Sequence, residues 1–154
     1  MKEYNIKYNK DNKEKIKEYK ENNKEKMNEK RRIYNKNKKI NDPLFKLKHN
    51  IRNIIYKSII GNGYKKNGKT ENIIGISYTQ FRLHLEKQFE PWMTWDNYGK
   101  YNGEPNYGWD IDHIKPISLG KNEEELIELN NYINLQPLCS YINRVIKREN
   151  PYYN

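Results

Sequence analysis

The sequence predicts an α+β protein in which a C-terminal strand, strand and helix module follows an α-helical region and a long charged N-terminal helix. Three patterns indicate this class: a charged repeat at the start, helical apolar spacing in the middle, and two short extended runs in the last third. The corresponding regions are residues 1–42, 43–99 and 100–150. With 154 residues, of which 34% are hydrophobic, the chain can form one domain with a modest core and an appendage.

The first region, residues 1–42, contains an internal repeat. The run Asn12–Glu18 recurs as Asn23–Glu29, at an offset of 11 residues. Because 11 residues make nearly whole helical turns, Ile16 and Met27 fall on one stripe, which predicts a helix. The stripe is thin, so the helix either stands in solvent without a partner or follows a phosphate backbone.

The middle region is predicted to contain two helices. The first follows Asp42, its expected N-cap, and ends at Gly61. Its apolar positions recur every three or four residues: Leu44, Leu47, Ile51, Ile54, Ile55 and Ile59. The second opens at Ser77, with Gln80 at the spacing of a capping box, and closes at Pro91.

Aromatic residues gather between the helical region and the C-terminal module. They are Trp92, Trp95 and Tyr98, and the run from Asp96 to Gly99 is expected to form a turn. We interpret the cluster as core that seats the module. Stacking of nucleic-acid bases on these rings is the alternative.

The last third alternates short elements. Trp109–His113 is an extended run that ends in a carboxylate and an imidazole, and Ile133–Leu138 is a second strand with a proline near its end. Between them, Glu123–Leu129 is a short acidic helix, expected to face away from nucleic acid because it would repel phosphate. A final helix is predicted over Ser140–Arg148. Trp109, Ile111, Ile114, Leu135 and Leu138 are the expected core of the module.

Charge is unevenly distributed along the chain. The net charge of +10 divides into +7 for residues 1–42, +5 for residues 43–108 and −2 for residues 109–154. If the substrate is a polyanion, most contacts with it come from the first two thirds. An AT-rich genome would explain much of the asparagine excess without requiring lysine to outnumber glutamate.

Four polar residues of the last third could together hydrolyse a phosphodiester. His113 titrates near neutrality and can act as general base, while Asp112 and the Asn143 carbonyl offer oxygen ligands for Mg²⁺. Asn134 can form a hydrogen bond near His113 and select its tautomer. Strict alternation along a strand would place Asp112 and His113 on opposite faces, so the strand is expected to bend or end there, with Asp110 as a reserve ligand.

These motifs resemble the HNH endonuclease family. The similarity lies in Asp112-His113, in Asn134-Leu135-Gln136-Pro137-Leu138, and in Asn143 nine positions after Asn134. It extends upstream through His84-Leu85-Glu86-Lys87-Gln88-Phe89 and Met93-Thr94-Trp95-Asp96-Asn97-Tyr98-Gly99, which look like the corresponding segments of phage and giant-virus HNH proteins. The resemblance covers residues 43–150 and implies a ββα-metal fold that cuts double-stranded DNA.

The resemblance also implies the cofactor and the roles of the four residues. Asp112 and Asn143 would hold one divalent cation, Mg²⁺ or alternatively Mn²⁺, with His113 as base and Asn134 as its support. No structural zinc is expected, because Cys139 is the only cysteine. The family's helix lysine, three residues after the asparagine, is replaced by Ile146.

Nucleic-acid binding is assigned to basic residues of the helical region and the last helix. These are Arg52, Lys57, Lys65, Lys66, Arg144 and Lys147, of which Lys65 and Lys66 lie in a basic loop from Tyr64 to Thr70. Arg144 is a candidate to replace the missing family lysine at the phosphate, because Lys147 comes one position late.

Two other functions remain as alternatives to the nuclease. The chain could bind nucleic acid through the same fold without catalysis, or the N-terminal repeat could mediate self-association. No apolar run approaches the length of a membrane span and the N-terminus lacks the apolar core of a signal peptide, so we expect an intracellular protein that is neither membrane-bound nor secreted, in the host cytoplasm or nucleus if it is viral.

Overall fold

A computed structural model of the chain describes residues 2–147, which divide into two units. The first unit is Met1–Asn41 and the second begins at Asp42. The fold is α+β, as the sequence predicts. None of the helices within residues 2–147 combines the length and the apolar character that crossing a bilayer requires.

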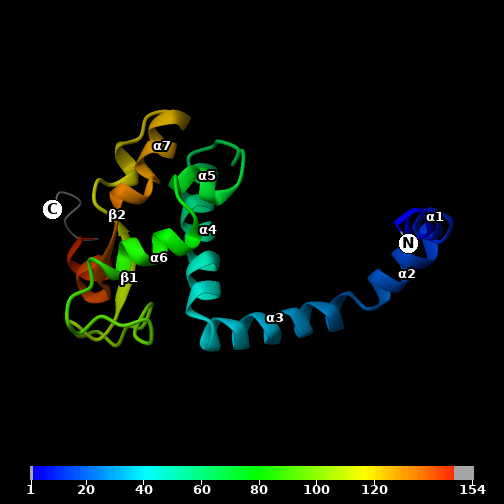
Figure 1. Ribbon diagram of the computed structural model, residues 1–154, viewed down its shortest axis with the longest axis horizontal. Helices are drawn as coiled ribbons and strands as arrows, with labels where there is room; N and C mark the ends of the chain where they lie inside the picture. Colours follow the sequence, from blue (N-terminus) through cyan, green and yellow to red (C-terminus); the bar gives the residue numbers. More distant parts are fainter. Residues whose placement is uncertain (1, 148–154) are drawn as a thin grey trace. The chain divides into compact units, whose positions relative to one another are not determined.

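The first unit consists of three consecutive helices, where we expected one. They are α1 (Lys2–Asp11), α2 (Lys13–Asn22) and α3 (Lys24–Asn41) (Figure 1). No described residue of α2 or α3 is buried. The charged repeat therefore forms helix without building a core.

The helix breaks follow the repeat and have a local cause. The side-chain amide of Asn12 donates to the carbonyl of Tyr8 at 3.0 Å, and that of Asn23 donates to Tyr19 at 2.9 Å. Each carbonyl also accepts from the backbone N–H of the same asparagine. Asparagine side chains compete in this way for helical carbonyls. An asparagine every 11 residues therefore interrupts the helix once per repeat.

The second unit opens with α4 (Pro43–Ile60), whose predicted boundaries are confirmed. Asp42 accepts the Phe45 N–H at 2.9 Å as the N-cap, and Gly61 is the C-cap. The sequence pattern missed α5 (Thr70–Ile74), which is too short to show helical periodicity.

Helix α6 (Tyr78–Glu86) begins at the predicted Ser77 capping box. It ends earlier than the expected Pro91. The amides of Gln88 and Phe89 bond three residues back, to Leu85 and Glu86, and this tightens the chain out of the α-helix.

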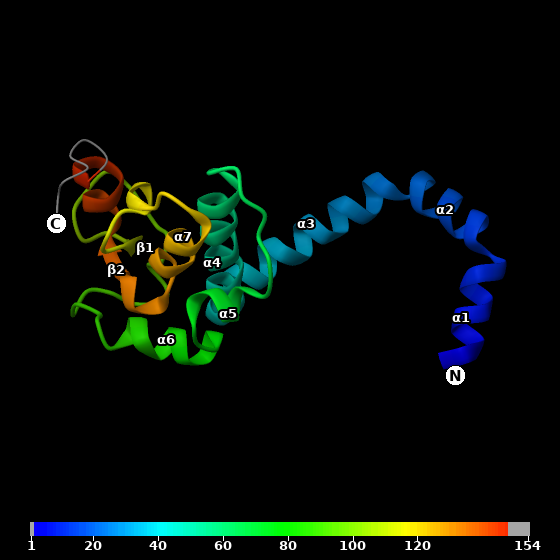
Figure 2. The same ribbon diagram turned by 90° about the horizontal axis from the view of Figure 1, so that it is seen from above.

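Two antiparallel strands form the sheet, β1 (Trp109–His113) and β2 (Leu135–Cys139), with α7 (Glu123–Leu129) between them in sequence (Figure 2). Asp112 pairs with Gln136 and His113 with Leu135. Strand β2 starts two residues later than expected, because residues 132–134 form a 3-10 turn.

The last helix begins at Ser140, as expected, and becomes a π-helical turn over Ile142–Ile146. Arg148, its expected last residue, and the predicted module boundary at residue 150 lie outside the described residues. The second unit therefore contains the predicted order of strand, helix, strand and helix.

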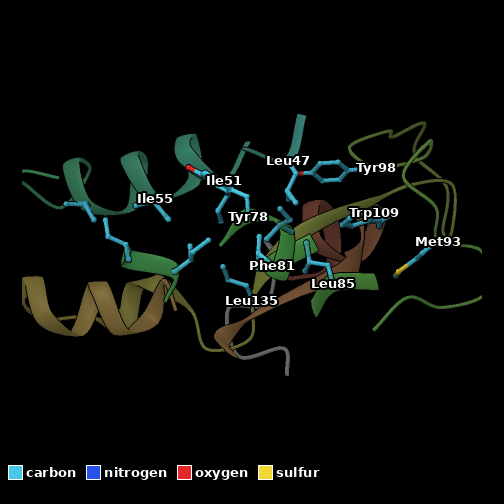
Figure 3. Close-up of a cluster of buried hydrophobic side chains, with 14 residues drawn as sticks. Leu47, Ile51, Ile55, Tyr78, Phe81, Leu85, Met93, Tyr98, Trp109 and Leu135 are labelled. Atoms are coloured by element: carbon cyan, nitrogen blue, oxygen red, sulfur yellow. The ribbon is translucent and has the colours of Figure 1, made fainter. Parts of the chain in front are cut away.

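The core joins the helical region to the sheet. Figure 3 shows side chains of α4, including Leu47, Ile51 and Ile55, pointing toward Phe81 of α6 and Leu135 of β2. All five are completely buried. Residues 43–99 and the sheet therefore share one hydrophobic core.

An aromatic cluster fixes the start of β1. The Trp109 ring is fully buried and lies 4.5 Å from Tyr98, 5.2 Å from Trp95 and 4.8 Å from Phe89, measured between centroids. Its indole N–H donates to the Thr94 carbonyl at 2.7 Å. Tyr98 and Trp109 thus belong to the hydrophobic core, as we interpreted them, and nucleic-acid bases cannot stack on their rings.

Ile114 was wrongly assigned to the core. Its side chain is 42% exposed because it follows the end of β1 rather than lying within the strand. With Leu119 and Ile133 it lines an open groove of about 480 Å³ beside Asn134. Trp109, Ile111 and Leu135 are buried as expected, and Leu138 is half-buried.

Candidate functional site

Strand β1 carries the candidate site at its C-terminal end. It stays paired as far as His113 and ends there, which is one of the two outcomes that the sequence predicts. Asp112 accordingly contacts Lys147 of the last helix, whereas His113 contacts Asn130 at the end of α7. The acid and the imidazole diverge, as alternation along a strand requires.

A buried chain of hydrogen bonds holds His113. Its Nε2 lies 3.2 Å from Oδ1 of Asn130. Asn130 is completely buried, and its Nδ2 donates to Ser58 Oγ at 2.8 Å and to the Leu126 carbonyl at 2.7 Å. Ser58 in turn donates to the Ile55 carbonyl at 2.9 Å. The imidazole is thereby tied to α4 and α7.

This chain selects one tautomer of His113. The carbonyl of Leu126 can only accept, so the NH₂ of Asn130 must face it and Oδ1 must face the imidazole. An oxygen acceptor at Nε2 requires the proton on Nε2. Nδ1 then carries the lone pair, and it is the atom that can accept a proton from water.

Burial lowers the pKa of His113 below its ordinary value of 6.5, and Lys147 lowers it further. The bond to Asn130 and the Asp112 carboxylate act in the opposite direction but do not reverse the shift. The neutral imidazole, which is the form a general base requires, is therefore the form favoured at neutral pH.

We expect His113 to make folding depend on pH. Because its pKa is lower in the folded state, the unfolded chain binds the extra proton. The free energy of unfolding therefore has its full value, as far as His113 is concerned, above about pH 6.5, and it decreases as the pH falls below that value. When the pH is lowered from about 7.5 to about 5, the urea concentration at the midpoint of unfolding should fall less for His113→Gln than for the wild type. Equal falls would contradict this expectation.

Substitution of Asn130 should shift the pKa of His113 in opposite directions. Asn130→Asp places a carboxylate at Nε2 and should raise it, whereas Asn130→Leu removes the acceptor and should lower it. The histidine ring resonances, followed by NMR across pH, measure both shifts. Leucine should also destabilise the protein by about 1–3 kcal/mol, because Ser58 and Leu126 lose their donor. Shifts of the same sign would refute the tautomer assignment.

Asp112 forms an ion pair with Lys147 of the last helix. Its Oδ2 accepts from Lys147 Nζ at 2.6 Å and from Gln136 Nε2 at 3.1 Å. The same ammonium donates to the His113 carbonyl at 2.6 Å. Two oxygens thus converge on one positive charge, and hard oxygen donors of this kind suit Mg²⁺ or Mn²⁺.

A π-helical turn brings Lys147 to this position. The turn spans Ile142–Ile146 and is wider than an α-helical turn by one residue. The turn lies directly before Lys147, whose side chain reaches Asp112. In the structure the Lys147 ammonium is bound to Asp112, and its assignment to nucleic-acid binding stays a prediction.

Asn134 forms its hydrogen bonds with the backbone of the loop after β1 and not with the His113 side chain. Its Oδ1 accepts the Lys115 N–H at 2.8 Å, and its Nδ2 donates to the carbonyls of Lys115 and Leu129 at 3.1 and 2.8 Å. The predicted support of the imidazole comes instead from Asn130. The reason is that Asn134 precedes β2 and bonds to Lys115 in the loop after β1, whereas Asn130 ends α7 within hydrogen-bond distance of the imidazole Nε2.

Asn143 is half-buried in the π-helical turn that follows β2. Residues 2–147 contain no group of three histidine, cysteine or acidic side chains that could hold a metal. The ligands that the sequence predicts for one divalent cation, Asp112 and Asn143, stay a prediction. Asp110 is not free as a reserve ligand, because Arg144 binds both of its oxygens at 2.7 Å.

The predicted nucleic-acid-binding residues separate into three groups. Arg144 is paired with Asp110 and lies 5.1 Å from the Tyr101 ring, and Lys147 is bound at Asp112. Arg52 and Lys66 line one recess between α4 and α5. Lys57 and Lys65 are exposed on the same unit. The six residues therefore do not form one surface at β1.

Three residues of the site were missed from sequence: Asn130, Gln136 and Ser58. Gln136 could have been found, because it stands opposite Asp112 once the two strands are paired in register. Asn130 and Ser58 carry no such signal, since they lie 72 residues apart and meet only through packing of α4 against α7.

Comparison with known proteins identifies relatives in one virus. The chain is 33% identical over 112 residues to an uncharacterized protein of Acanthamoeba polyphaga mimivirus, covering 71% of the chain and 45% of that protein. A second uncharacterized mimivirus protein is 33% identical over 105 residues, covering 67% and 42%. The chain thus spans less than half the length of these relatives. No family model and no solved structure matches.

Proposed function

We propose that the chain is a metal-dependent endonuclease of the HNH type that hydrolyses phosphodiester bonds of double-stranded DNA. One observation carries the proposal: a histidine held in a single tautomer is the neighbour in sequence of an acid whose carboxylate binds the Lys147 ammonium. The ββα order and Asn143 on the final helix support the same assignment.

The residues of the site divide the chemistry between them. Nδ1 of His113 accepts a proton from the attacking water, while Asn130 keeps the ring oriented through Nε2. Asn134 fixes the backbone at Lys115 and so the end of the strand. Asp112 and Asn143 would hold one divalent cation, Mg²⁺ or Mn²⁺, whose chemistry is neutralisation of charge on the phosphate and the leaving oxygen.

Incubation with supercoiled plasmid tests this proposal. In the presence of Mg²⁺ or Mn²⁺ we expect nicked or linear DNA, and EDTA should prevent its formation. Asn143→Ala should raise the metal concentration needed for half-maximal cleavage. Persistence of the supercoiled form at every metal tried would refute the proposal.

A second function is favoured by one specific contact. Lys147 neutralises Asp112 at 2.6 Å, and a protein that binds nucleic acid without cutting it could retain this ion pair permanently. Such a protein would shift DNA in a gel in a salt-dependent way, without cleavage and without any effect of His113→Ala.

Lys147→Met separates the two functions. If the ammonium and a divalent cation compete for Asp112, removing the ammonium should lower the Mg²⁺ concentration needed for half-maximal cleavage. Lys121→Met is the matched control, because it removes an exposed lysine charge that lies before α7 rather than at Asp112, and the metal requirement should not change. A higher metal requirement in Lys147→Met would contradict competition, and absence of cleavage in every variant would favour the binding protein.

A further inference from the structure

A basic recess lies on the second unit, lined by α4, α5, the loop between them and the first residue of α6. Its walls include Arg52, Asn53, Tyr56, Lys66, Lys69 and Tyr78, and its volume is about 500 Å³. Ligand sites for small molecules or single nucleotides range from roughly 300 to 1,000 Å³. The recess is therefore large enough for one nucleotide unit.

The positive charges of the recess outnumber the negative. Arg52, Lys66 and Lys69 face it together with one carboxylate, Glu71. One oxygen of that carboxylate accepts a hydrogen bond from the backbone N–H of Tyr78 at 2.9 Å, and this bond partly compensates its negative charge. The remaining field favours an anion with several oxygen acceptors, such as phosphate.

Arg52 is held in place before any ligand arrives. Its Nε donates to the Tyr78 hydroxyl at 3.1 Å, and its guanidinium lies 5.7 Å from the centre of the same ring. Tyr78 is only 7% exposed, so the support is rigid. A guanidinium has five N–H donors and this bond uses one, so donors remain for phosphate oxygens.

The aromatic ring of Tyr56 gives the recess a second kind of contact. Its side chain is 55% exposed although it belongs to α4, whose opposite face forms the core. An exposed ring beside fixed cations is the combination by which proteins hold single nucleotides, with the base against the ring and the phosphate on the cations.

Helix α4 connects the recess to the candidate site. Arg52 and Tyr56 precede Ser58 on this helix, and Ser58 belongs to the hydrogen-bond chain that holds His113. Arg52 and Ser58 are separated by roughly 9 Å along the helix axis, from a rise of about 1.5 Å per residue. A nucleic-acid strand bound in the recess would therefore contact the same helix, α4, that holds the proposed general base His113 through Ser58 and Asn130.

We propose that this recess binds a phosphate of a nucleic-acid strand, with the attached nucleoside against Tyr56, and that it anchors the strand for the site on β1. The choice of a nucleic acid as the ligand rests on the proposed function. The anchoring contact itself does not require cleavage.

Binding of labelled oligonucleotides to the full chain in EDTA tests the proposal. We expect Arg52→Gln combined with Lys69→Gln to weaken binding at least about tenfold and to reduce the slope of log affinity against log salt by about two, because two phosphate contacts are lost. Lys121→Gln, which removes one exposed charge outside the recess, should leave affinity within about twofold. Melting temperatures of all variants report whether they are folded.

Tyr56 variants isolate the aromatic contact. Tyr56→Ala should weaken binding of a single strand at least about fivefold without changing the salt slope, and Tyr56→Phe should restore it. ATP and inorganic phosphate, added as competitors, distinguish a strand from a free phosphate compound.

Three results would overturn the proposal. They are wild-type affinity in the double variant, an equal loss in Lys121→Gln, and tight binding of ATP at the recess without binding of the strand. The assay contains no metal and can be repeated in His113→Ala. A protein that fails to cut plasmid but loses strand binding in the recess variants would refute the proposed nuclease while supporting the recess.

Discussion

His113→Ala should reduce plasmid cleavage by at least about 100-fold, which is the lower limit for loss of a general base. The substitution removes an imidazole whose neutral form is favoured at neutral pH and whose Nδ1 is left to accept a proton. DNA affinity should stay within about twofold, because the imidazole is neutral and contributes little to phosphate binding. Cleavage rates and gel shifts on the same preparation measure both.

His113→Gln is the matched control for folding. The glutamine amide can donate to Asn130 as Nε2 does, so the buried chain to Ser58 and Ile55 is retained. It cannot act as a base near neutral pH. We expect the glutamine variant to be folded and as inactive as the alanine variant. Cleavage at the wild-type rate in either variant would remove His113 from the mechanism.

Trp109→Ala should cost about 3–5 kcal/mol of the free energy of unfolding, as measured by urea denaturation. The indole is fully buried and contacts Tyr98, Trp95 and Phe89, so truncation leaves a cavity that these rings cannot fill. The Thr94 carbonyl would also lose its donor. Cleavage should be lost with stability, because Trp109 begins the strand that ends in His113.

Trp92→Ala provides the comparison within the same aromatic segment. Trp92 is only half-buried, and its indole N–H donates to the exposed Glu90 side chain. Its truncation should cost about 1 kcal/mol, the typical effect away from the fully buried core. Equal losses for the two tryptophans would contradict the view that Trp109 organises the core at the sheet.

Local signals in the sequence were sufficient to predict most elements of the second unit. Asp42 and Ser77 cap their helices as expected, because a cap involves residues three positions apart. Glu123–Leu129 is helical as expected, and the two strands follow the two extended runs. The N-terminal region shows the limit of periodicity, since the repeat that predicts one helix also supplies the asparagines that divide it.

The candidate site was less predictable because its contacts are distant in sequence. Asp112 and His113 were singled out as neighbours, yet the pleat of β1 directs one to Lys147 and the other to Asn130. Motif spacing suggested Asn134 as the support of the imidazole, and the fold places Asn130 there. The pairing at Asp112 depends on how the last helix packs against β2, and the bond at His113 depends on how α7 packs against α4.

The sequence by itself determined the residue types available for chemistry, the order of the elements and the amphipathic face of α4, because these depend on local spacing and composition. Only the tertiary structure decided the tautomer of His113, the lysine at Asp112 and the basic recess beside Tyr78. The physical reason is that each of them is made by side chains from different elements, whose meeting is set by the shared hydrophobic core.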